Sequence, residues 1–113
     1  MISDAPVVIP EGQSGRMELA RWLTDAEQGA GQLAARVLAN RTWQHGIGRG
    51  LVGTVDNFGR TGEAPSHPEL LDWLACEFVD SGWNVKTLMR RMVLSATYRQ
   101  DSGASPEAFA RDP

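Results

Sequence analysis

The stretch SHPELLDWLACEFVDSGWN, residues 66–84, decides the fold. Ser66, followed three residues later by Glu69, has the pattern of an N-terminal capping box, and Pro68 suits a first helical turn because that amide has no helical partner. Apolar residues then recur at helical spacing on one half of the wheel. They are Leu70, Leu71, Leu74, Ala75, Phe78 and Val79. Gly82 follows where a C-terminal glycine cap belongs, so the stretch predicts an amphipathic helix and the turn that ends it.

A second helix follows this turn directly. Asn84 is a natural N-cap, and the helical pattern continues to about Tyr98. Its main apolar face comprises Val85, Leu88, Met89, Met92, Val93 and Ala96. A second stripe comprises Thr87, Arg91, Leu94 and Tyr98. The second stripe predicts contact with something other than the preceding helix.

Two more helices are predicted upstream. RMELARWL, residues 16–23, has helical spacing and is followed by two glycines, while no glycine or proline interrupts the run from Gln32 to about His45. Residues 46–65 contain six glycines, which predicts a long connecting loop. Within it, LVGTV at 51–55 is a candidate for a brief strand.

The expected architecture is therefore an all-α domain with four main helices and a long glycine-rich loop between the second and third. The helical domain spans residues 16–100. An extended lead-in covers residues 1–15, and a polar tail, frayed or belonging to a truncated parent, covers 101–113.

Composition narrows the function classes. The chain has 113 residues and a net charge of −3, and Lys86 is the one lysine among eleven basic residues. Arginine pairs readily with carboxylates, so we expect internal ion pairs rather than a basic patch, and nucleic-acid binding is disfavoured. Cys76 is the single cysteine, which excludes a disulfide within the chain. No window reaches the roughly 18 apolar residues of a membrane span.

The candidate site lies on the predicted second helix. Leu33, Val37, Asn40 and Gln44 share one face, and Ala34, Leu38, Arg41 and His45 share the next. Polar side chains on a buried arc need partners, and the loop acids Asp56 and Glu63 are candidates. Two interpretations stay open. In one, a network that includes Arg49 ties the loop onto the helix; in the other, the same residues form the mouth of a ligand pocket.

His67 also has two interpretations. It can be a structural residue at a helix start, or it can line a substrate or metal pocket together with His45, Arg49 and Asp56. Tyr98 is a candidate binding residue on the second stripe of the last helix. No catalytic triad can be assigned, since Ser95 has no histidine at helical spacing. We therefore predict no catalytic residue, no metal and no cofactor.

Four stretches carry a family resemblance: NRTWQHGIGRGLV (40–52), DNFG (56–59), PSHPELLDWLA (65–75) and SATYRQ (95–100). Together they resemble the N-terminal portion of a planctomycete-type C-terminal domain of unknown function. That domain occurs in long exported proteins that also carry a cytochrome-c-like domain. The resemblance implies a location in the periplasm or cell envelope, with neighbouring domains of the parent protein, or an envelope component, as partners.

The expected function is a non-enzymatic structural or interaction module of a larger bacterial exported protein. One alternative is part of an enzyme site, redox or polymer-degrading, completed by another domain. A second is helix-turn-helix DNA binding, because a short glycine-containing turn joins the last two helices and Arg90, Arg91 and Arg99 decorate the second. Acidic residues on the preceding helix weaken the DNA-binding alternative. They are Asp72, Glu77 and Asp80.

Overall fold

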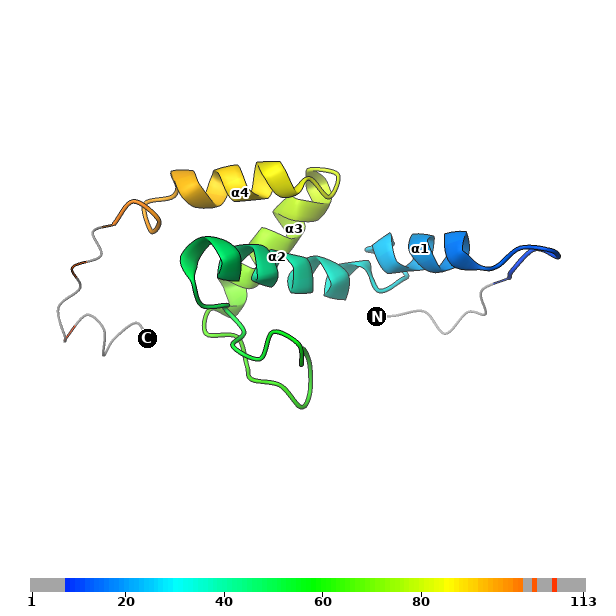
Figure 1. Cartoon of the computed structure of the whole chain (residues 1–113), viewed down its shortest axis with the longest axis horizontal. Helices are drawn as coiled ribbons and strands as arrows, with labels where there is room; N and C mark the ends of the chain where they lie inside the picture. The colour runs from blue at the N-terminus through cyan, green and yellow to red at the C-terminus, as the bar shows by residue number, and fades with distance from the viewer. Residues whose placement is uncertain (1–7, 101–102, 104–106, 108–113) are drawn as a thin grey trace.

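The computed structural model describes residues 8–100, 103 and 107. It contains four helices, α1 (Arg16–Thr24), α2 (Gly31–Ile47), α3 (Pro68–Asp80) and α4 (Val85–Leu94) (Figure 1). The all-α class and the long gap between α2 and α3 are confirmed. No strand occurs among the described residues, so the brief strand expected at 51–55 is wrong: those residues form bends and the start of a turn. No helix in the described part of the chain is long and apolar enough to cross a membrane.

The core forms where α2, α3, α4 and the start of the loop meet. In Figure 1, α3 crosses behind α2. Helix α4 lies above α2 in this view and is joined to the upper end of α3 by a turn. The buried cluster comprises Ala35, Ala39, Leu51, Val52, Leu71, Leu74, Ala75, Phe78, Leu88 and Met92. The apolar half of α3 predicted from the sequence supplies the largest share, and its remaining members, Leu70 and Val79, are partly buried against this cluster. The predicted orientation of α3 is therefore confirmed.

The buried face of α2 differs from the faces expected. Ala35 and Ala39 are fully buried, whereas Leu33 and Leu38 are exposed. Alanine on the contact face lets a neighbouring helix approach closely, and the larger leucines remain outside that contact. Of the residues on the two predicted faces, Asn40 alone is buried.

The start of α3 departs from the expected capping box. The helix begins one residue later than predicted, with His67 at the N-cap position and no side-chain capping bond. Ser66 makes a different contact: its N–H and its hydroxyl both donate to the Leu51 carbonyl, at 2.8 and 3.2 Å. The two ends of the loop are joined by this contact. Pro68 lies in the first turn as expected.

The end of α3 has the predicted glycine cap. Gly82 has φ of 70°, a left-handed conformation that favours glycine. Its N–H donates to the Val79 carbonyl and the Trp83 N–H donates to the Phe78 carbonyl, both at 2.9 Å. This pair of bonds is a Schellman motif. The Trp83 ring also packs edge-on against Phe78, with 5.3 Å between the ring centroids, so the turn is fixed to the core.

Helix α4 begins as predicted and ends early. The Asn84 side chain accepts the Thr87 N–H at 3.1 Å, which confirms the N-cap. The helix stops at Leu94 instead of continuing to about Tyr98. Ser95 explains the stop: its hydroxyl donates to the Met92 carbonyl at 2.6 Å and accepts the Tyr98 N–H at 3.2 Å. A serine side chain that bonds its own backbone favours a turn over further helix.

Helix α1 projects from the helical body along the long axis of the molecule, which extends 62 Å (Figure 1). It contacts α2 but neither α3 nor α4, and none of its residues is buried. A tight link joins it to α2, with Ala30 N–H donating to the Trp22 carbonyl at 2.9 Å. A Cβ on Gly31 would lie 2.5 Å from the Asp25 carbonyl carbon, so this approach requires glycine.

Asp25 orders the same link. Its Oδ1 accepts the N–H groups of Gln28 and Glu27, each at 2.9 Å, and these bonds lower the pKa of the Asp25 carboxyl. The predicted helix at 16–23 is confirmed with one further residue. Part of the predicted lead-in, residues 1–7, and nearly all of the predicted tail lie outside the described residues.

Candidate functional site

Asn40 fixes the loop to α2. It is 0% exposed, its Nδ2 donates to the Val52 carbonyl at 3.0 Å, and its Oδ1 accepts the Val52 N–H at 2.9 Å. The amide thus satisfies both backbone groups of one loop residue within the core, where an unpaired group is costly. The contacts agree with the network interpretation. We name this pair of bonds the Asn40 clamp.

Arg41 makes a second contact with the loop. Its Nη2 lies 2.8 Å from the Asp56 Oδ1, so one of the two predicted acid partners is confirmed. Both side chains are largely exposed, and exposed pairs of this kind contribute little to stability. Glu63, the other candidate, lies over Gly53 instead, and its N–H donates to the Thr54 hydroxyl at 2.9 Å.

Four predicted site residues line one open recess of about 290 Å³ between α2 and the loop. They are Arg41, Gln44, His45 and Asp56. Gly53 and Val55 complete the lining from the loop side. The recess offers hydrogen-bonding groups, and its arginine and aspartate already pair with each other. Ligand binding by these residues stays a prediction.

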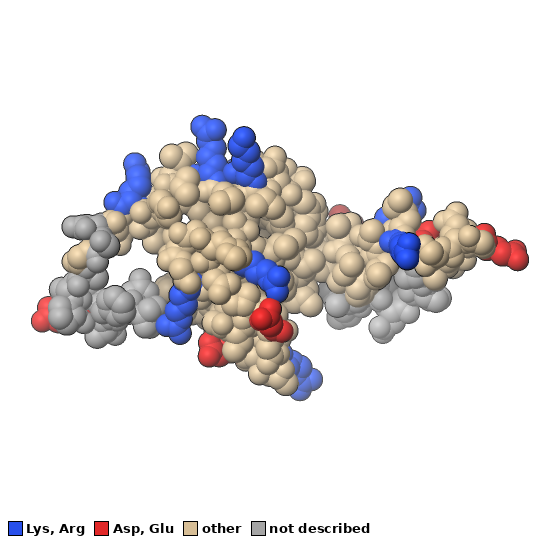
Figure 2. Space-filling model, in the orientation of Figure 1, with Lys and Arg blue, Asp and Glu red and all other residues tan. Residues whose placement is uncertain are grey.

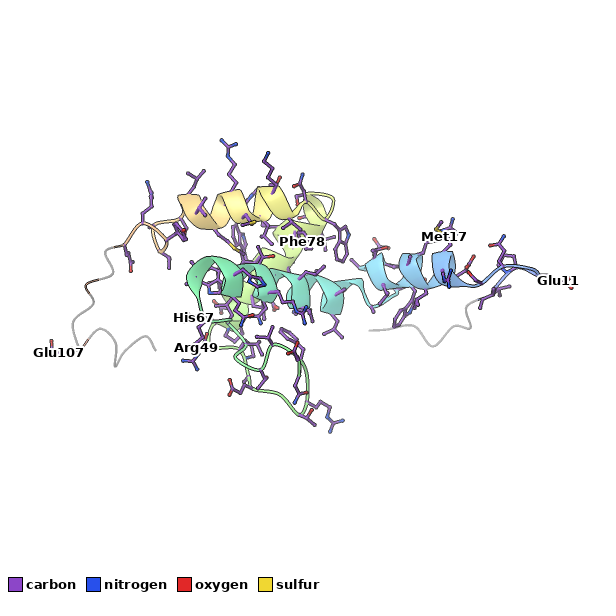
Figure 3. The ribbon with its side chains drawn as sticks, in the orientation of Figure 1. Glu11, Met17, Arg49, His67, Phe78 and Glu107 are labelled. Carbon is purple, nitrogen blue, oxygen red and sulfur yellow. The ribbon has the colours of Figure 1, made fainter. Side chains whose placement is uncertain are left out.

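Four predicted residues lie outside this recess: the buried Asn40, and Arg49, His67 and Tyr98. Figure 3 shows Arg49 and His67 at the end of the helical body where the loop joins α2 and α3. His67 is exposed at the start of α3, with its Nδ1 3.0 Å from the Ser66 hydroxyl. Tyr98 is exposed beyond the end of α4. Over the described residues, no three His, Cys, Asp or Glu side chains are placed to hold a metal ion.

An ion pair that the sequence did not predict joins α2 and α3. Arg36 Nε lies 2.6 Å from Asp72 Oδ1, and this hydrogen bond lowers the pKa of the Asp72 carboxyl. The two residues also line a groove of about 370 Å³ between the helices, whose apolar lining includes Ala75 and Val79. No spacing in the sequence indicates this pair, because its members are 36 positions apart on different helices.

The apolar face of α4 is only half covered. Leu88 and Met92 are buried in the core, whereas Val85, Met89 and Val93 are exposed. The predicted apolar face is therefore buried only in part, because it is wider than the surface that α2 and α3 cover. Leu94, on the second stripe, is also exposed.

The same helix is cationic. It contains Lys86, Arg90 and Arg91 and no acidic residue, and Figure 2 shows basic side chains projecting from the side of the molecule where α4 lies. Arg91 already pairs with Glu77 on α3, and its guanidinium lies 6.0 Å from the centre of the Trp73 ring. Arg91, one of the arginines invoked for DNA binding, is thus engaged within the chain.

The comparisons with known proteins identify a family and no function. Searches of the curated proteins and of the solved structures gave no match. The sequence profile of the PSD1 family, described as "Protein of unknown function (DUF1553)", matches residues 15–113. This range contains all four helices and every residue of the candidate site. The chain therefore belongs to the PSD1 family of proteins of unknown function (DUF1553).

Proposed function

We propose that this chain is a docking module within a larger exported protein and has no catalytic activity of its own. The observation that carries the proposal is the exposed apolar surface on α1 and on the outward side of α4. Large apolar side chains exposed on these two helices are Met17, Leu19, Leu23, Val85, Met89, Val93 and Leu94. These seven are half of the large apolar side chains exposed among the described residues, and exposed apolar patches are typical of contact sites.

The case for α1 rests on helix stability. A helix of 9 residues is marginal in water by itself, and α1 buries none of its residues. Its ties to the body are the backbone bonds of the α1–α2 link and the partial burial of Trp22. Leu19 and Leu23 share one side of α1, and Met17 lies on another side. A partner that surrounds the helix and covers all three would supply the tertiary contacts that normally stabilise a short helix.

The case for α4 rests on its divided face. Leu88 and Met92 anchor the helix to the core, so the backbone that carries Val85 and Met89 is held in place. A rigid apolar surface binds with little ordering cost. This favours a preformed docking face.

The family resemblance suggests the partners. A parent protein of this kind carries a cytochrome-c-like domain and is directed to the periplasm or cell envelope. We propose that the neighbouring domains of that parent cover α1 and α4, and an envelope component is the other candidate. The Asn40 clamp and the Arg41–Asp56 pair then serve to hold the loop in place.

Methionine oxidation tests the proposal, because the helices supply both probes and a control. Met17 and Met89 are 59% and 45% exposed, whereas Met92 is 4% exposed. In the chain alone, peroxide should oxidise Met17 and Met89 rapidly and Met92 slowly. In the full-length parent protein, Met17 and Met89 should become as slow as Met92. Unchanged rates of Met17 and Met89 in the parent would contradict the docking function.

A further inference from the structure

We infer that the partner of α4 is an acidic amphipathic helix. The inference rests on the proposed docking function and specifies its chemistry at one of the two surfaces. Two features of α4 carry it: a narrow apolar stripe and a pair of cations beside that stripe. We name these five residues the α4 face. They are Val85, Lys86, Met89, Arg90 and Val93.

The apolar stripe has the geometry of a helix contact. Val85, Met89 and Val93 are spaced at four-residue intervals, so they line up along one side of α4 over about 12 Å. All three are exposed. A row at this spacing forms a ridge that fits the groove of a second helix.

The cations give the partner its charge. Lys86 and Arg90 are one turn apart and lie next to the stripe on the side away from the core. Neither forms an ion pair within the described residues, whereas Arg91 is paired with Glu77. The α4 face contains no acid to neutralise them. A partner helix with Glu or Asp at matching four-residue spacing would pair with both cations while its apolar residues cover the stripe.

An anionic membrane surface fits the α4 face less well. Helices that lie in a membrane interface insert a broad apolar face, commonly with Trp, Phe or Leu. The other half of the apolar arc of α4 is buried in the core through Leu88 and Met92. The exposed stripe is therefore one residue wide and contains no aromatic side chain. A narrow ridge of this kind fits the groove of a second helix.

Two synthetic helical peptides of about 18 residues test the inference. Both carry the same apolar positions, and one has glutamate and the other lysine on the flanks. Amide NMR titration of the whole chain at low salt should show the glutamate peptide shifting the signals of Val85, Met89 and Val93. Its affinity should exceed that of the lysine peptide by about tenfold, as expected for two exposed ion pairs. Equal affinities, or shifts located elsewhere, would overturn the inference.

Charge reversal supplies the matched control. Lys86→Glu combined with Arg90→Glu should reverse the preference in favour of the lysine peptide. Arg21→Glu on α1, also at an exposed position, should leave it unchanged. If the unmodified chain binds phosphatidylglycerol vesicles but binds neither peptide, the α4 face belongs to a membrane contact and the inference is overturned.

The two proposals fail in different ways. If Met89 is protected in the parent protein but the peptides bind equally, docking at α4 stands and the acidic partner is wrong. If Met17 and Met89 stay reactive in the parent, the docking function itself is wrong.

Discussion

In the core, where α2, α3, α4 and the start of the loop meet, Phe78 is 1% exposed, whereas Met17 on α1 is 59% exposed. Both are large apolar side chains on helices, so residue type does not explain the difference. The centre closes on itself through the Schellman turn after α3 and the Asn40 clamp. Helix α1 is joined to α2 at its C-terminal end and, among the four helices, contacts only α2. The contrast separates a core whose apolar side chains are buried within the chain from a helix whose apolar side chains stay exposed.

The largest expected effect comes from replacing the two compared residues, Phe78 and Met17, with alanine. Phe78→Ala should lower the free energy of unfolding by about 3–5 kcal/mol, because it leaves a cavity and removes the ring contact with Trp83. Met17→Ala should change it by less than about 0.5 kcal/mol. Urea denaturation followed by tryptophan fluorescence measures both. Similar losses would show that α1 belongs to the core.

Next in size is the Asn40 clamp, which holds the loop at the centre. Asn40→Ala should cost about 2–4 kcal/mol, because the buried N–H and carbonyl of Val52 both lose their partner. Arg41→Ala, one residue along, breaks an exposed ion pair and should cost less than about 1 kcal/mol. Denaturant unfolding compares the two variants. An Asn40→Ala effect no larger than that of Arg41→Ala would contradict the clamp.

Glycine-to-alanine changes at the two ends of α2 give a smaller test, because they should change the stability in opposite directions. Gly31→Ala places a methyl group 2.5 Å from the Asp25 backbone and should destabilise the α1–α2 link by about 1–3 kcal/mol. Gly46→Ala meets open space within the helix and should stabilise the protein by about 0.5–1 kcal/mol. Thermal melting by circular dichroism measures both changes. Stabilisation by Gly31→Ala would mean that the α1–α2 link does not approach Gly31 as closely as described.

The smallest expected effect is the pH dependence of the Arg36–Asp72 pair. Because the hydrogen bond from Arg36 lowers the pKa of Asp72 in the folded state, the pair stabilises the protein above the ordinary aspartate pKa. This contribution is lost as the pH falls through the lowered value. Asp72→Asn should therefore cost up to about 1 kcal/mol at neutral pH and progressively less in acid.

Asp80→Asn on the same helix is the control for this pair. It leaves the 2.6 Å contact between Arg36 and Asp72 intact and should preserve the acid-dependent loss. Denaturant unfolding at several pH values compares the two variants. A cost of Asp72→Asn that is constant from neutral pH into acid would contradict the ion pair.

The sequence predicted the elements well where the signal is local. The apolar half of α3 and the glycine after it depend on neighbours within a few residues, and both were found as expected. Ser66 shows the limit of local reasoning. Its spacing from Glu69 fits a capping box, but its N–H and hydroxyl bond Leu51 across the loop instead. A capping residue and a loop tie have the same side chain, and only the fold distinguishes them.

The candidate site was partly predictable for a related reason. A polar residue such as Asn40 on an apolar arc indicates that it has a buried hydrogen-bond partner. Asp56 in the loop was a candidate acid partner for the polar residues that include Arg41. The Arg36–Asp72 pair has no such signal, because its two members lie on helices that are distant in the sequence.

By itself, the sequence determined four helices, the turn between α3 and α4, and the long segment between α2 and α3, since propensity, capping and apolar period act over a few residues. Only the tertiary structure decided which apolar side chains are buried. Leu88 and Val85 belong to one apolar arc, yet the first is in the core and the second is exposed. The physical reason is that burial depends on how much surface the neighbouring helices present, and that quantity is set by packing across the whole chain.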